Sequence, residues 1–241
     1  FFPRLWTMIK EFIAHTRMVK FRTVGIAHWL VMIGFMLGAI VWFEAYIQTF
    51  NPRGGWPWLS EQSWYHVIDE ILGLGTVIGI TALIIIRQVN QRRGLNRFVG
   101  SDRKAAYFVE TVVLLEGLGM IFVKAGKLAL YRADGQDFHW ATDWVSGPLS
   151  TILPANELMV SIFALIKLLT GMIWLYVVGR NITWGVAWHR FSAFFNIYFK
   201  READGGVALG AAKPMMSNGV ILDMETADPD VDAFGAGKIE D

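Results

Sequence analysis

Long apolar runs separated by short polar segments dominate the sequence. Each run has twenty or so residues, and at a rise of about 1.5 Å per residue this is enough to cross the hydrocarbon core of a bilayer as a helix. The runs cover residues 24–47, 66–86, 106–130 and 158–178. Such a pattern predicts an all-α integral membrane bundle with four transmembrane helices. Glycines within the runs favour close approach between neighbouring helices.

The segments that flank the runs differ from them in pattern. Residues 3–20 place apolar side chains on one helical face and charged ones elsewhere, which predicts an amphipathic helix lying at the membrane surface. From about Ala203, glycines alternate with acidic residues, as is typical of a linker or docking strand. We therefore divide the chain into an amphipathic segment (1–23), a transmembrane domain (24–202) and an acidic, glycine-rich tail (203–241).

Positive charge is unevenly distributed between the connecting segments. Lysines and arginines gather before Val24 and between residues 87 and 104, whereas the other two loops hold only Arg53 and Arg132. Cytoplasmic segments of membrane proteins carry this excess. The sequence thus predicts a multi-pass protein of the inner (plasma) membrane, with the amphipathic helix, the 87–104 segment and the tail in the cytoplasm.

Composition narrows the chemistry that the chain can carry. Of its 241 residues 54% are hydrophobic and the mean hydropathy is +0.39, which is too apolar for a soluble domain. The chain has no cysteine, so it holds no disulfide, thiolate zinc site or cysteine-ligated iron–sulfur cluster. Any metal must be held by His, Met or carboxylate side chains. The net charge of +1 gives no argument for a nucleic-acid partner.

Two of the five histidines are predicted on the same side of the membrane. His28 lies near the start of the first run, and His189 follows the fourth run, which passes through Arg180 and Asn181 into a Trp-rich segment. The first helix starts in the cytoplasm and the fourth ends there. Two imidazoles facing each other across a bundle are the axial ligand set of a six-coordinate b-type haem. The alternative is that both are boundary residues without a ligand.

The remaining histidines and two glycines bear on this interpretation. His66 and His139 fall on the outer side, and His15 on the flank of the amphipathic helix is expected to be a solvated surface residue. Gly25 and Gly185 precede the two candidate ligands by three and four residues. We expect these glycines to clear space beside each ring.

Ionisable residues inside the runs are the other candidates, because charge at membrane depth is costly. Glu116 and Lys167 lie near the middles of the third and fourth runs. They could line a proton path or contact a quinone, but a structural pair with each other is the favoured interpretation. Four further residues nearer the outer boundary are expected to extend their charges to the membrane surface. These are Glu44, Glu70, Lys124 and Lys127.

Several stretches resemble one family of membrane cytochromes. The similarity extends over nearly the whole chain and is most specific in 15–18, 25–29, 185–191, 196–205 and 211–216. These stretches resemble the cytochrome b (gamma) subunit of respiratory nitrate reductases. They are more similar to its actinobacterial relatives fused to heterodisulfide-reductase-like iron–sulfur proteins, of the electron-transferring-flavoprotein:menaquinone oxidoreductase type.

The resemblance implies an electron-transfer domain of a quinone-linked oxidoreductase. Electrons released in fatty-acid oxidation would pass from electron-transferring flavoprotein to menaquinone, through iron–sulfur clusters in a domain following Asp241. The family has five helices, which implies one more before Phe1. One haem b on the cytoplasmic side would be held by His28 and His189. Relatives with two haems carry further histidines at the positions of Gly38 and Gly171, so only one haem is expected here.

Two other functions fit parts of the pattern. A membrane transporter would use Glu116 and Lys167 as a coupling site, although no inverted repeat or pair of broken helices accompanies them. A plain membrane anchor would have no haem and only incidental histidines. A reduced-minus-oxidised absorption spectrum separates these alternatives from a cytochrome.

Overall fold

The structure, a computed structural model, describes residues 1–16, 18–94, 102–200, 202, 214–217, 220–223, 225–228 and 231–232. Four long helices form the body of the protein: α2 (Arg22–Phe50), α3 (Ser63–Arg92), α4 (Arg103–Ala133) and α6 (Glu157–Arg180). Each is long and apolar enough to cross a membrane. The predicted all-α membrane bundle is confirmed, and every helix extends beyond its apolar run at both ends.

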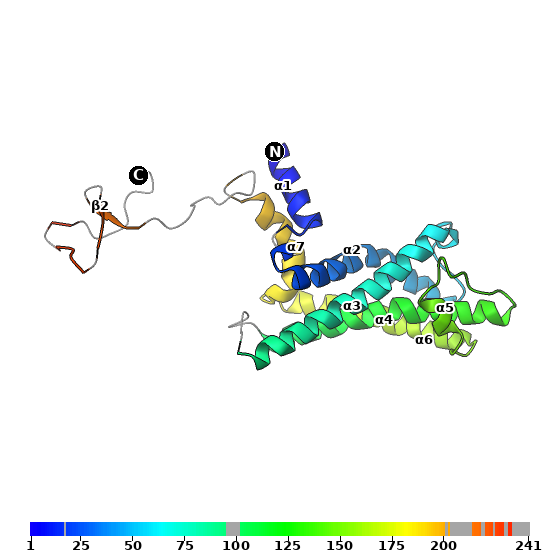
Figure 1. Ribbon diagram of the computed structural model, residues 1–241. Coiled ribbons are helices and arrows are strands. Elements are labelled where there is room, and N and C mark those ends of the chain that lie inside the picture. Colours follow the sequence, from blue (N-terminus) through cyan, green and yellow to red (C-terminus); the bar gives the residue numbers. More distant parts are fainter. Residues whose placement is uncertain are drawn as a thin grey trace.

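The four long helices lie side by side and form a closed bundle (Figure 1). Helix α2 packs against α3 and α6, and α4 packs against the same two helices from the other side. The starts of α2 and α4 and the ends of α3 and α6 meet at one end, which we name the histidine end. The short helices η2 (Leu59–Glu61) and α5 (Ser146–Ser150) lie at the opposite end, which we name the loop end.

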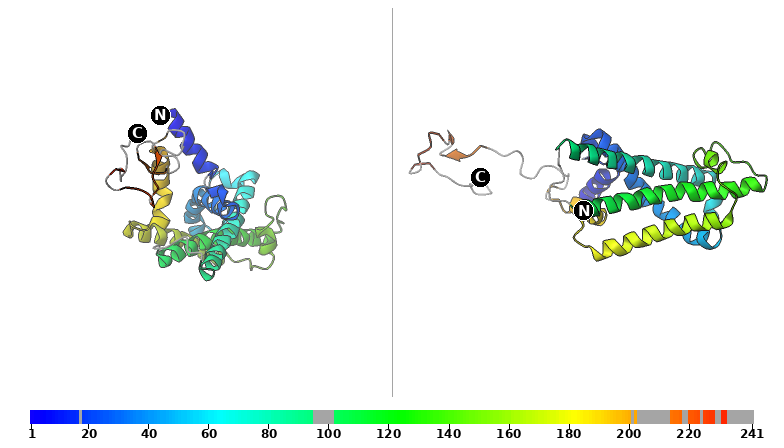
Figure 2. Two further views of the ribbon diagram at one scale, coloured as in Figure 1. Left: turned by 60° about the vertical axis from the view of Figure 1, so that its left-hand side comes forward. Right: turned by 90° about the horizontal axis from the view of Figure 1, so that it is seen from below.

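Three shorter elements occupy the histidine end. These are α1 (Phe2–Ile13), η1 (Met18–Lys20) and α7 (Gly185–Tyr198). Helices α1 and α7 project across the direction of the long helices (Figures 1 and 2). The Phe12 and Phe194 rings lie 4.4 Å apart, and the Arg4 guanidinium donates to the Tyr198 carbonyl at 3.1 Å. Contacts at both ends of α1 therefore hold it against α7.

One element boundary differs from the sequence prediction, and a turn defines another. Helix α1 ends at Ile13, so the predicted helix over residues 3–20 was too long. The segment carrying His189 is a separate helix, because a turn breaks the chain after Arg180. Asn181 stabilises this turn: its Nδ2 donates to the Val177 carbonyl at 2.7 Å, and its own carbonyl accepts from Trp188 Nε1 at 3.2 Å.

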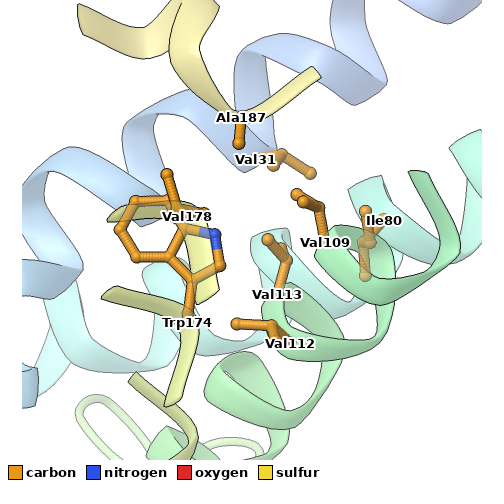
Figure 3. Packing of buried hydrophobic residues seen from close by; sticks show 8 residues of the cluster. All are labelled: Val31, Ile80, Val109, Val112, Val113, Trp174, Val178 and Ala187. Carbon is orange, nitrogen blue, oxygen red and sulfur yellow. The ribbon is translucent and has the colours of Figure 1, made fainter. Parts of the chain in front are cut away.

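Close packing in the bundle depends on glycines and on a cluster at the histidine end. A Cβ added at Gly34 would lie 1.9 Å from Thr76 Oγ1, so α2 and α3 approach as closely as predicted. Figure 3 shows the buried cluster formed by side chains of α2, α3, α4, α6 and α7. Ala187 of α7 is part of this cluster, which attaches α7 to the bundle.

The tail is described only in short stretches. Strands β1 (Met216–Ser217) and β2 (Val220–Ile221) pair in an antiparallel hairpin, with Met216 opposite Ile221. Most of the predicted glycine-rich, acidic segment 203–241 lies outside the described residues.

Candidate functional site

Three histidines come together where α1 and α7 meet the start of α2. The ring centres of His28 and His189 lie 6.1 Å apart, so the structure brings together the two residues singled out from the sequence. His15 is the third: its Nε2 lies 2.8 Å from His28 Nδ1. The prediction of a solvated His15 was wrong, because only 8% of its surface is exposed. His66 and His139 belong to segments at the loop end.

His15 reaches His28 because α1 already ends at Ile13. The chain turns at His15, whose φ of 50° is a left-handed conformation uncommon for a residue with a side chain. The turn is held by a hydrogen bond of 3.0 Å from Val19 N–H to the His15 carbonyl. Trp29 of α2 adds a second bond, from its Nε1 to the Ile13 carbonyl at 2.9 Å. The turn thereby directs the His15 side chain towards α2.

Of the two glycines near the candidate ligands, only Gly185 agrees with the prediction. A Cβ at Gly25 would lie 2.5 Å from the Met18 carbonyl oxygen, so Gly25 makes room for the backbone of η1 and not for a ring. A Cβ at Gly185 would meet nothing within 4 Å. Only the His189 side of the pair therefore has the open space expected beside a ligand.

Hydrogen-bond partners determine where the imidazole protons lie. The Phe12 carbonyl can only accept, so His15 Nδ1, at 3.0 Å from it, carries a proton. In a neutral ring, His15 Nε2 is then an acceptor, and His28 Nδ1 donates to it. His189 Nδ1 likewise donates to the Gly185 carbonyl at 3.2 Å. Both His28 and His189 are left with an unprotonated Nε2, and in the described part of the chain neither Nε2 is hydrogen-bonded.

Local electrostatics favour the neutral form of His189. Partial burial lowers the pKa of this imidazole, and the neighbouring Arg190 guanidinium lowers it further. Burial also lowers the pKa of Arg190, to about 10, which leaves it charged at neutral pH. Its guanidinium lies over the rings of Phe35 and Trp174, at 5.0 and 5.7 Å from their centres. Neutral imidazole is the form that binds a metal.

The spacing of the pair fits two axial ligands of one iron atom. Two metal–nitrogen bonds of about 2 Å each, added to the distance from each nitrogen to its ring centre, separate the ring centres by roughly 6 Å when both nitrogens point at the metal from opposite sides. The observed separation of 6.1 Å agrees with this value. A porphyrin supplies the other four nitrogens, so two imidazoles complete the coordination of a haem.

Side chains fill the positions where a second haem would need ligands. A Cβ at Gly38 would lie 2.4 Å from Met120 Cε, and one at Gly171 would lie 2.1 Å from Trp42 Nε1. These glycines admit a methionine tip and an indole against the helix backbone.

The charged residues in the middle of the bundle are arranged differently from the prediction. Glu116 and Lys167, both described, are close enough to interact electrostatically, but no hydrogen bond or ion pair within 4 Å joins them. Lys167, only 1% exposed, donates from Nζ to the Val41 carbonyl at 2.8 Å, and Glu116 Oε1 is buried without a hydrogen-bond partner. Asp69 is a second carboxylate near Lys167.

Asp69 was not among the residues predicted from the sequence to be functional, because it lies close to the polar segment that precedes the second run. Its Oδ1 is buried without a hydrogen-bond partner. A carboxylate three residues inside a predicted span is costly, and this position alone was a signal that it faces the bundle interior. Asp69, Glu116 and Lys167 thus form an interior group of charges contributed by α3, α4 and α6.

The four residues expected to extend towards the membrane surface contact protein groups instead. Lys124 lies 3.0 Å from Glu70 and 3.1 Å from Asp143, all three being buried. Glu44 accepts hydrogen bonds from the Tyr65 hydroxyl at 2.8 Å and from Trp56 N–H at 3.1 Å. Lys127 Nζ donates to the Gly54 carbonyl at 2.7 Å. The loops of the loop end cover these charges, which is why they stay inside.

Comparison with known proteins adds no assignment. No known protein family, no curated protein and no solved structure matches this chain. The geometry of the three histidines and the sequence resemblance described above are therefore the basis of the functional argument.

Proposed function

We propose that this chain is the membrane b-type cytochrome domain of a quinone-linked oxidoreductase. It would relay electrons between a cytoplasmic iron–sulfur or flavoprotein partner and menaquinone. The observation that carries the proposal is the pair of imidazoles, His28 and His189, each with its Nδ1 hydrogen-bonded and its Nε2 unprotonated. These two residues would hold one haem b, which when bound accepts and releases one electron at a time.

The residues around the pair supply orientation and a low dielectric. Hydrogen bonds at both Nδ1 atoms fix the tautomers and limit rotation of the rings. The apolar cluster that joins α7 to the bundle, including Val31, Trp174 and Ala187, would keep water out of the adjoining bundle interior (Figure 3). Exclusion of water and the Arg190 charge nearby both influence the reduction potential of a group bound here.

The charge distribution supports a cytoplasmic position for the histidine end. Most lysines and arginines of the connecting segments lie there, including those of α1, the end of α3 and the start of α4. At the loop end, Arg53 pairs with Asp134 and Glu157 at 2.5 and 2.9 Å. Under the positive-inside rule the histidine pair would then lie within reach of soluble electron-transfer partners.

Sidedness is testable because the chain contains no cysteine. Single substitutions Arg92→Cys, Trp56→Cys and Asp134→Cys introduce one thiol at the histidine end or at the loop end. We expect a membrane-impermeant thiol reagent to label only Trp56→Cys and Asp134→Cys in intact cells. Arg92→Cys should react only after the membrane is opened. Labelling of Arg92→Cys in intact cells would contradict the proposed orientation.

The partners in the proposal come from the sequence resemblance. It implies an iron–sulfur domain following residue 241, electron-transferring flavoprotein as the soluble donor, and a role in the respiratory chain of fatty-acid oxidation. A histidine pair on the cytoplasmic side suits a first electron acceptor from such partners, because the distance to a soluble donor is short. Menaquinone in the bilayer would take the electrons next.

The direct test is the absorption spectrum of the purified protein in detergent. We expect the reduced-minus-oxidised difference spectrum to show the bands of a low-spin b-type haem, and a menaquinol analogue to reduce that haem. Protein purified with its helices folded but without any haem band, even after haem addition, would leave the transporter or the plain anchor. A haem that dithionite reduces and the menaquinol analogue does not would retain the cytochrome and remove the quinone link.

A further inference from the structure

His15 has a contact that a surface residue of α1 would not need. It is buried, and it lies in a left-handed turn immediately after the helix. Both of its ring nitrogens are hydrogen-bonded, Nδ1 to the Phe12 carbonyl and Nε2 to His28 Nδ1. His15 therefore has no lone pair left for a metal, although its ring centre is only 5.0 Å from that of His28.

The two candidate ligands obtain their Nδ1 partners in different ways. His189 donates to the carbonyl of Gly185, four residues earlier in its own helix, which is a bond that local helix geometry provides. His28 instead donates to a side chain from another element of the fold. An imidazole nitrogen is a stronger base than a peptide carbonyl. His15 Nε2 therefore draws the Nδ1 proton away from His28 more strongly than a carbonyl would.

We propose that His15 is a positioning residue that orients His28 and raises its basicity as a haem ligand. This inference rests on the proposed function. Two hydrogen bonds act in series: His15 Nδ1 donates to the Phe12 carbonyl, and His28 Nδ1 donates to His15 Nε2. They leave the lone pair of His28 Nε2 to bind iron. A more basic axial imidazole stabilises ferric relative to ferrous iron. His15 thereby lowers the reduction potential of the haem.

His15 also takes part in the contacts that hold α2, which carries His28, close to α7, which carries His189. Helix α1 packs on α7 through Phe12 and Phe194, and its end is bound to α2 through His15 and Trp29. Because Trp29 makes the second bond between α1 and α2, it provides a matched control. Trp29→Phe loosens the end of α1 without removing the acceptor of His28.

The experiment compares His15→Phe, His15→Gln and Trp29→Phe with the unaltered protein in a redox titration of the haem. Phenylalanine keeps a ring but offers no acceptor, whereas a glutamine carbonyl can still accept from His28. We expect His15→Phe to favour ferrous iron by about tenfold, which is about 59 mV for one electron. His15→Gln should shift the potential less, and Trp29→Phe should leave it unchanged. Low-spin haem should remain in all three variants.

Three outcomes would overturn the inference. Equal potentials in His15→Phe and Trp29→Phe would show that His15 only holds α1 in place. Loss of low-spin haem from both His15 variants, with normal haem in Trp29→Phe, would make His15 an axial ligand. An unaltered protein without haem would remove the proposed function and this inference together. The first two outcomes leave haem in the unaltered protein, so the two kinds of failure are distinguishable.

Discussion

The two ends of the bundle use polar residues in opposite ways. At the loop end, one group of buried charges is paired within the chain: Lys124 contacts Glu70 and Asp143, and Glu70 also accepts from Val145 N–H at 2.6 Å. At the histidine end, His28 and His189 are each hydrogen-bonded at one nitrogen only. The loop end is closed, whereas His189 is exposed.

This difference separates structural polar groups from candidate ligand-binding ones. Buried charge is tolerated where every group meets a partner, and such a network holds loops onto helices. The histidine pair differs from this network, because each imidazole is oriented through Nδ1 and keeps the lone pair of Nε2 for a ligand or for water. We therefore assign a structural role to the charges of the loop end and propose the histidine pair as the functional site. The interior charges Asp69, Glu116 and Lys167 lie between these two cases.

The largest effect on stability is expected at the loop end, from Lys124→Met. Removing this cation leaves two carboxylates, Glu70 and Asp143, buried together, which should cost about 3–5 kcal/mol. Thermal unfolding in one detergent measures the loss, with Lys104→Met, an exposed lysine at the start of the same helix, as the control. Equal stability of the two variants would contradict a structural role for the network.

A smaller effect is expected for the interior charges, and it tests which carboxylate balances Lys167. Asp69→Asn removes a negative charge near the buried Lys167 ammonium and should destabilise the protein by about 1–3 kcal/mol. Glu116→Gln should cost less, because Glu116 Oε1 has no hydrogen-bond partner to lose. The same thermal unfolding measurement decides between them. A larger loss in Glu116→Gln would restore the pairing of Glu116 with Lys167 that the sequence suggested.

A functional role of the interior charges would give a different result. If both variants remain folded and keep their haem but a menaquinol analogue no longer reduces it, these residues serve proton transfer or quinone binding. The two measurements on the same samples separate stability from electron transfer.

The sequence predicted features that depend on single segments. Four apolar runs were enough to predict four spanning helices, and charge distribution with the alternation of spans placed His28 and His189 together. The position of His15 depends on packing between segments. The chain turns at His15, and the following helix η1 lies against α2 at Gly25. No local pattern predicts that turn. Nor does periodicity predict that loops fold over Glu70 and Lys124.

We propose that His28 and His189 are the axial ligands of one haem. The measurement is haem content and low-spin spectrum of His28→Ala, His189→Ala, His66→Ala and His139→Ala, at matched amounts in the membrane. Insertion depends on the apolar runs, so all four variants should reach the membrane. We expect only His28→Ala and His189→Ala to lose low-spin haem. Normal haem in either of these two variants, or loss of haem in His66→Ala, would contradict the assignment.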